Sequence, residues 1–166
     1  MPRIKHTASA IAALVISALF ALPASAQVVY DPLTTQNVVN LLKQKGMDAT
    51  VENRNEAAQG DYVLSKSGNV NFWIHFTACD PDGTNCEIIK FDAGFSYADP
   101  DDRPLLEDIN TWNEDYYGKA GLDPNGDPFV MIELNIVGGI TEKNLADTLI
   151  WWESMILDFT DFINWS

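Results

Sequence analysis

Two stretches of the chain alternate apolar and polar residues with the period of a β-strand. Residues 69–78 place Phe72, Ile74, Phe76 and Ala78 on one side and Asn71, Trp73, His75, Thr77 and Cys79 on the other. Residues 86–97 place Ile89, Phe91, Ala93, Phe95 and Tyr97 on one side. Alternation with a period of two predicts strands that each bury one face.

Shorter apolar runs between turn residues predict further strands. We expect them over 49–53, 61–65 and 116–122, with a fourth marked by Val130, Ile132, Leu134 and Ile136 and ending at Gly138-Gly139. The Asn125-Gly126 step in the 123–127 turn is typical of a hairpin.

Apolar residues spaced three and four apart predict three helices. The first spans 34–45, with Thr34 or Thr35 as its cap and Gly46 at its end. The second follows the turn at 99–102, with Pro104 near its first turn. Leu105, Ile109 and Trp112 form its apolar stripe. The last helix follows Thr141, with a stripe of Leu145, Leu149, Trp152, Ile156, Phe159 and Ile163.

The predicted order is one helix, four strands, one helix, two strands and one helix. Consecutive strands joined by tight turns pair antiparallel. We therefore expect an α+β domain in which three helices pack on an antiparallel sheet of about six strands.

The N-terminal segment is typical of a secretory signal peptide. Arg3 and Lys5 precede an apolar stretch over about 8–22, which is short for a membrane span of ~20 residues. Ala24-Ser25-Ala26 has the form of a cleavage site. The alternative is an uncleaved membrane anchor. We predict cleavage after Ala26 and a single domain over 27–166 in a periplasmic or secreted protein, with no membrane span after cleavage.

The acidic composition restricts the partners. The formal net charge is −14, and removal of Arg3 and Lys5 with the signal peptide makes it −16. Binding to nucleic acid is therefore disfavoured, because phosphates require Lys and Arg. A solvated surface explains the acidity most simply, and a basic partner or a cation stays open.

The two cysteines bracket the short sequence CDPDGTNC. A register that places Cys79 opposite Cys86 also places Ile74 opposite Phe91 and Phe76 opposite Ile89, so the apolar faces match. Either a two-residue turn at 82–83 or a four-residue loop over 81–84 satisfies this register. We predict a disulfide on the less apolar face, formed in an oxidising compartment. A redox site lacks the Cys-x-x-Cys spacing.

Candidate chemistry is sparse. His75 is the single histidine after cleavage, and the register places it opposite Lys90 on a strand surface. No nucleophile, phosphate-loop or calcium-loop motif is present, so we predict no catalytic residue, no metal site and no cofactor. The alternative is a cation-dependent ligand binder or hydrolase that uses the Asp-rich turns at 80–82, 99–102 and 123–127.

The aromatic residues suggest a different kind of site. Trp73 and His75 lie on the less apolar strand face, and Trp151 lies off the main helix stripe. Exposed aromatic side chains within an acidic surface suit protein binding. The alternative is that a second layer covers them. These three residues are the predicted partner-binding residues.

The segments NCEIIKFDAGF, INTWN and YYGKAGLDPNGDPFVMIELNIVGGIT resemble secreted members of the YbjN family. The matching positions are Cys79, Cys86, Phe91, Phe95, Ile109, Asn110, Trp112, Asn113, Gly118, Gly138 and Gly139. The resemblance covers roughly 68–163. Family members often carry basic residues after the Trp-Asn pair, whereas this chain continues Glu114-Asp115-Tyr116-Tyr117. An anion-binding role is therefore not transferred to it.

The resemblance implies a fold similar to type III secretion chaperones and a role in sensory regulation, without catalytic residues. We therefore expect a non-enzymatic domain that binds a protein or peptide, in regulation or envelope stress. The resemblance to secretion chaperones also implies that this domain can form a homodimer.

Overall fold

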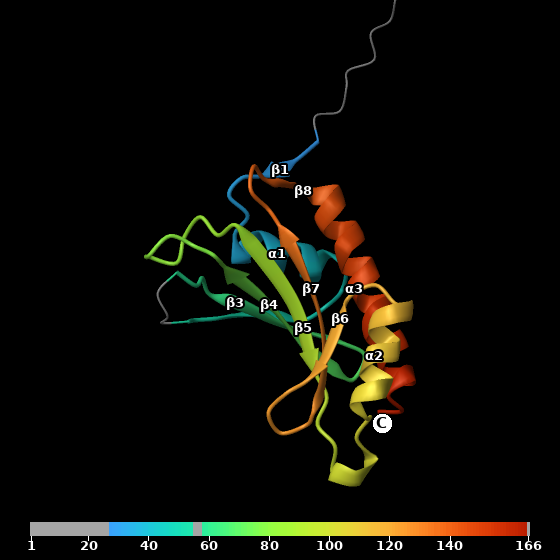
Figure 1. The fold of residues 1–166 in the computed structure, drawn as a ribbon. Helices are drawn as coiled ribbons and strands as arrows, with labels where there is room; N and C mark the ends of the chain where they lie inside the picture. Colours follow the sequence, from blue (N-terminus) through green and yellow to red (C-terminus); the bar gives the residue numbers. More distant parts are fainter. Residues whose placement is uncertain (1–26, 55–57, 166) are drawn as a thin grey trace, which may run out of the picture.

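The computed structural model describes residues 27–54 and 58–165 (Figure 1). Its helices are α1 (Thr35–Gln44), α2 (Leu106–Asp115) and α3 (Glu142–Phe162), with a 3-10 turn η1 (Pro100–Asp102). Its strands are β1 (Val29–Tyr30), β2 (Ala49–Glu52), β3 (Tyr62–Ser67), β4 (Val70–Thr77), β5 (Ile88–Gly94), β6 (Lys119–Leu122), β7 (Pro128–Asn135) and β8 (Ile140–Thr141). The predicted signal peptide lies outside the described residues.

Six strands form one antiparallel sheet in the order β2-β3-β4-β5-β7-β6, and β1 pairs with β8 separately. The predicted α+β class, with three helices on a sheet of about six strands, is confirmed. The sequence pattern does not predict β1 and β8, because two residues carry no periodicity.

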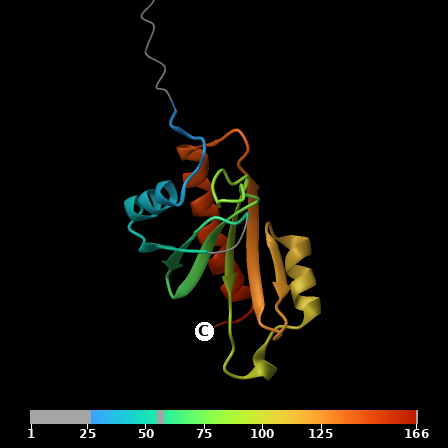
Figure 2. The same ribbon diagram turned by 90° about the vertical axis from the view of Figure 1, so that its left-hand side faces the viewer.

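The helices cover one face of the sheet. Figure 2 views the strands with α3 running behind them. Trp152 of α3 is fully buried between Phe72 and Phe91, with ring centroids 6.0 and 5.8 Å away. The predicted α3 stripe lies wholly in the core. We call the other side of the sheet the open face; it carries Trp73, His75, Lys90 and Asp92.

Local sequence signals explain where α1 and α3 begin. The Thr34 hydroxyl accepts a hydrogen bond from the Asn37 backbone N–H, and the Asn37 side chain accepts one from the Thr34 backbone N–H. Thr141 caps α3 by accepting from the Asn144 backbone N–H. Each cap satisfies backbone donors that lack a partner inside the helix.

The start of α2 differs from the prediction. Leu105 precedes the first helical residue and is 62% exposed, whereas Ile109 and Trp112 are buried. The Asp108 carboxylate accepts from the Leu105 backbone N–H and fixes the start of the helix one residue later. Leu105 is therefore not part of the core stripe.

The β4–β5 register is confirmed, but the turn beyond it is not the predicted one. Ile74 lies opposite Phe91, and the ladder ends where Thr77 pairs with Ile88. Ala78 then takes a positive φ of 52° and is exposed, which reverses the alternation of the side chains. As a result Cys79 joins the core instead of the less apolar face. Neither predicted loop length applies, because the connection spans all residues between Thr77 and Ile88.

Candidate functional site

The three predicted partner-binding residues do not form one surface. Trp73 and His75 lie on the open face in β4, as their alternation predicts. Trp151 lies on α3, on the helical side of the sheet, and is 62% exposed. The structure therefore contains two separate candidate surfaces.

On the open face, His75 is the centre of a polar cluster. Its Nε2 lies 2.7 Å from Asp92 Oδ1, and its Nδ1 lies 2.9 Å from Arg54 Nη2. Since a guanidinium can only donate, Nδ1 accepts and Nε2 carries the proton that is donated to Asp92. Arg54 also lies over the Tyr62 ring, with its Cζ 5.2 Å from the centroid, and donates to Gln59.

This cluster holds its members in place rather than presenting a reactive group. Both ring nitrogens of His75 are occupied, and Lys90 Nζ lies 3.4 Å from Asp92. A general base needs a free nitrogen directed at the atom that it deprotonates. The cluster therefore ties Arg54 and Gln59 to the middle of the sheet.

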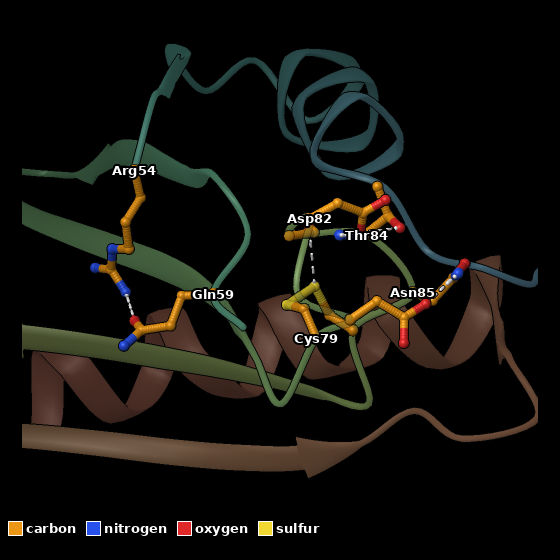
Figure 3. The surroundings of a disulfide bond; sticks show 9 residues. Arg54, Gln59, Cys79, Asp82, Thr84 and Asn85 are labelled. Atoms are coloured by element: carbon orange, nitrogen blue, oxygen red, sulfur yellow. Dashed lines mark hydrogen bonds between the residues drawn. A yellow bond between two sulfur atoms is a disulfide. The ribbon is translucent and has the colours of Figure 1, made fainter. Parts of the chain in front are cut away.

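A hollow of about 410 Å³ lies at the disulfide end of the molecule. Arg54, Gln59, Asp82, Thr84 and Asn85 are among its lining residues, and Figure 3 shows them around the disulfide, with Arg54 and Gln59 apart from Asp82, Thr84 and Asn85. Cys79 and Cys86 form a disulfide bond. Much of the polar lining is paired within the protein: Arg54 bonds to Gln59, and Asp82 bonds to Thr84.

The Asp-rich turns use their carboxylates to hold the backbone. Asp123 Oδ1 accepts from the backbone N–H groups of Asp127 and Asn125, and these bonds lower the pKa of Asp123. The Thr84 hydroxyl and backbone N–H lower the pKa of Asp82 in the same way. Across residues 27–54 and 58–165, no three His, Cys, Asp or Glu side chains are grouped as a metal would require.

The second surface is an aromatic groove between the end of α2 and the outer side of α3. We define the aromatic groove by the residues Tyr116, Tyr117, Ile150, Trp151, Met155 and Asp158. Its volume is about 310 Å³, and a second hollow of about 300 Å³ shares Tyr117 and Trp151 with it and is also lined by Asn144 and Asp147. Tyr117 is 67% exposed, so the groove presents apolar surface to solvent.

Two aromatic pairs shape this groove. The Tyr117 and Trp151 rings meet nearly at right angles, at 88°, with centroids 5.8 Å apart. Tyr116 stacks on the buried Trp112 at 4.1 Å. The first pair therefore forms an exposed corner, while the second ties the groove to the core.

Asn113 fixes the position of both tyrosines. Its amide Nδ2 donates to the Ala120 carbonyl at 3.1 Å, and its Oδ1 accepts from the Ala120 N–H at 2.8 Å. This two-bond clamp closes the chain into a tight connection over 116–118. Gly118 completes it with a φ of +102°, a conformation that side chains rarely adopt.

The sequence pattern predicts Trp151 as an exposed side chain but does not bring Tyr116, Tyr117, Ile150 and Met155 to it. The pattern assigns 116–122 to a strand, whereas β6 begins at Lys119. Asn113 and Gly118 are the residues in the sequence that could have indicated a turn here. In the structure, the Asn113 side chain bonds to Ala120 and Gly118 takes a positive φ, so residues 116–118 form a connection instead of a strand.

No helix in the described part of the chain combines the length and hydropathy that a membrane crossing requires. In comparisons with known proteins, no curated protein and no solved structure matches the chain. One family model does match, over residues 34–165, which is most of the chain. It is the YbjN model, described as "Putative bacterial sensory transduction regulator". The chain therefore belongs to the YbjN family.

Proposed function

We propose that this YbjN-family chain is a non-enzymatic regulator, exported to the periplasm, that binds a segment of another protein in the aromatic groove. The family description supports a regulatory role. The signal-peptide pattern of residues 1–26 and the Cys79–Cys86 disulfide support an exported location.

The aromatic groove is the observation that carries the binding proposal. Trp151, Tyr117 and Ile150 are each at least half exposed and adjoin one another. Tyrosine and tryptophan are the residues that most often dominate binding energy, because each buries a large area and loses few rotatable bonds. The second hollow shares Tyr117 and Trp151 with the groove, and two adjoining hollows suit an extended or helical segment.

The alternative of a cation-dependent binder or hydrolase is favoured less. The carboxylates of Asp82 and Asp123 accept hydrogen bonds from their own turns. These bonds direct carboxylate oxygens at N–H donors, and a bound cation would compete with those donors. Calorimetry with calcium chloride tests the alternative, and a saturable heat with a rise in melting temperature would support it.

Site-specific photocrosslinking in the native host tests the binding proposal. A photoreactive benzophenone amino acid is placed at Ile150, which lines the groove, and in a second strain at Lys66, which is exposed on the open face. We expect one reproducible adduct with another protein from position 150, and none from position 66.

The partner is then identified by mass spectrometry and its affinity measured with purified protein. Trp151→Ala is expected to remove the adduct at 150 and to weaken purified binding. An absent adduct, an adduct that survives Trp151→Ala, or an adduct only with a second copy of this chain would contradict the proposal.

A further inference from the structure

The helices that border the aromatic groove are strongly acidic. Together α2 and α3 carry nine carboxylates and one cation, Lys143, which lies in the first turn of α3. Asp158 lines the groove itself, and Asp147 lines the adjoining hollow that shares Tyr117 and Trp151 with it. The two helices therefore carry nine of the 24 acidic residues, and two of these line the groove or the hollow beside it.

The carboxylates next to the groove lack internal partners. The ion pairs among residues 27–54 and 58–165 join His75 and Lys90 to Asp92, and Arg103 to Asp127. Asp147 and Asp158 take part in none of these pairs. Two cations lie near: Lys119 lines a neighbouring hollow together with Glu133, and Lys143 precedes Asp147 by four residues on α3 without forming one of these ion pairs.

The C-terminal end of α2 carries negative charge, whereas positive charge stabilises the C-terminus of a helix. Its last residues include Glu114 and Asp115, and its last turn has no basic residue. Because the C-terminus of a helix carries partial negative charge, cations stabilise it and carboxylates destabilise it. Tyr116 and Tyr117 follow directly, so this unneutralised end adjoins the groove. Such departures from local stability rules are characteristic of functional surfaces.

The spacing on α3 places the charges beside the aromatic corner. Asp147, Trp151 and Asp158 are separated by four and seven residues, which puts them on one face of the helix. The perpendicular Tyr117 ring closes one side of Trp151. A guanidinium can stack on such ring faces while it donates to a neighbouring carboxylate.

We infer that the aromatic groove selects a basic segment, in which an arginine stacks at the Tyr117–Trp151 corner and pairs with Asp147 or Asp158 beside an apolar anchor. This inference rests on the proposed function and names the chemistry of its partner. Charge complementarity carries it: an apolar groove with unpaired carboxylates at its edge favours a partner that combines apolar and cationic side chains.

Fluorescence anisotropy with a labelled synthetic peptide tests the inference on the purified, processed protein. The probe has arginines on both sides of a leucine–phenylalanine pair. Matched probes replace the arginines with citrulline, which keeps the shape without the charge, or with glutamate. We expect the arginine probe to bind at least about threefold more tightly than the citrulline probe, and the glutamate probe not to bind.

Two matched double variants distinguish the effect of the carboxylates beside the groove on probe binding from the effect of the overall negative charge. Asp147→Asn with Asp158→Asn removes the carboxylates beside the corner, while Asp48→Asn with Glu52→Gln removes two exposed carboxylates near β2. We expect the first variant to weaken binding of the arginine probe at least about threefold and to flatten its salt dependence. The second variant should change binding less than about twofold.

The failures of the two proposals are distinguishable. Equal binding of the arginine and citrulline probes, or no effect of the Asp147/Asp158 variant, overturns the basic-segment inference. If position 150 still gives an adduct with another protein that Trp151→Ala removes, the proposed function stands without it. If the arginine probe binds and Trp151→Ala leaves its affinity unchanged, the probe binds elsewhere and the inference is overturned.

Discussion

At the scale of single residues, Asn113 determines the shape of the aromatic groove most directly. Its side chain makes both hydrogen bonds of the clamp to Ala120, and the two tyrosines lie inside the loop that this clamp closes. The sequence shows Asn113 as part of the INTWN segment but does not show its partner, because the contact forms only after the chain turns into β6.

Replacing Asn113 with alanine should therefore lower stability and affinity together. We expect the free energy of unfolding to fall by about 1–2 kcal/mol, because two hydrogen bonds are lost and a backbone pair at Ala120 is left without partners. Denaturant titration measures the stability, and anisotropy measures probe binding. Asn110→Ala, on an exposed turn of the same helix, is the control and should change both less. Equal effects of the two variants would contradict the clamp.

Asp123 gives a prediction about pH. Hydrogen bonds from the Asp127 and Asn125 backbone N–H groups lower its pKa in the folded state, so the folded state favours the charged carboxylate. The stabilisation is therefore present above the ordinary pKa of aspartate and is lost as the pH falls through the lowered folded value. Asp123→Asn should flatten this acid loss of stability.

The measurement for Asp123 is denaturant unfolding of wild type and Asp123→Asn from neutral to acidic pH. Asp48→Asn serves as the control, since the Asp48 carboxylate is exposed and accepts no hydrogen bond from the described residues. If the difference between wild type and Asp123→Asn does not shrink as the pH falls, the turn does not depend on the charged carboxylate.

At the scale of elements, the sequence predicts what periodicity encodes. The β4–β5 register follows from matching two alternating faces, and the α3 stripe follows from helical spacing. The ends of these elements do not follow, because they depend on single backbone choices. The positive φ at Ala78 directs the Cys79 side chain into the core. The hydrogen bonds of Asn113 to Ala120 hold 116–118 in a connection, so β6 begins only at Lys119.

Gly118 tests the connection between α2 and β6. A Cβ there would lie 2.5 Å from Met155 Sδ, and the φ of +102° is strained for any L side chain. Gly118→Ala should lower the free energy of unfolding by about 1–3 kcal/mol and weaken binding, because Met155 lines the groove. Gly94→Ala is the matched control, since a Cβ there meets no atom within 4 Å. A harmless Gly118→Ala would mean that this connection is not rigid.

Reduction of the disulfide tests whether the aromatic groove keeps its shape independently of the Cys79–Cys86 loop. Cys79 and Cys86 close a short loop, so reduction should lower the free energy of unfolding by about 2 kcal/mol in the chain-entropy account. The groove residues lie on other elements, and probe affinity should stay within about twofold of the oxidised protein. Thermal unfolding and anisotropy with and without reductant measure both. Loss of binding without unfolding would contradict this independence.

At the scale of the whole molecule, one face of the sheet packs in the core. The open face of the sheet and the aromatic groove are the two candidate surfaces outside the core. The open face holds Trp73 with the closed network around His75, whereas the helical side holds the groove around Trp151. The sequence predicts all three residues as a partner-binding set, because alternation and helical spacing report exposure. They do not report which exposed residues share a surface, and the groove is assembled only when the end of α2 and the following 116–118 connection pack against α3.

The most direct test compares the affinity of the crosslinked partner for two tryptophan variants. The groove predicts that Trp151→Ala weakens binding about tenfold or more, since a central exposed tryptophan is a typical hot spot, and that Trp73→Ala leaves it within about twofold. The reverse pattern, with binding lost on Trp73→Ala and kept on Trp151→Ala, would place the functional surface on the open face and contradict this account.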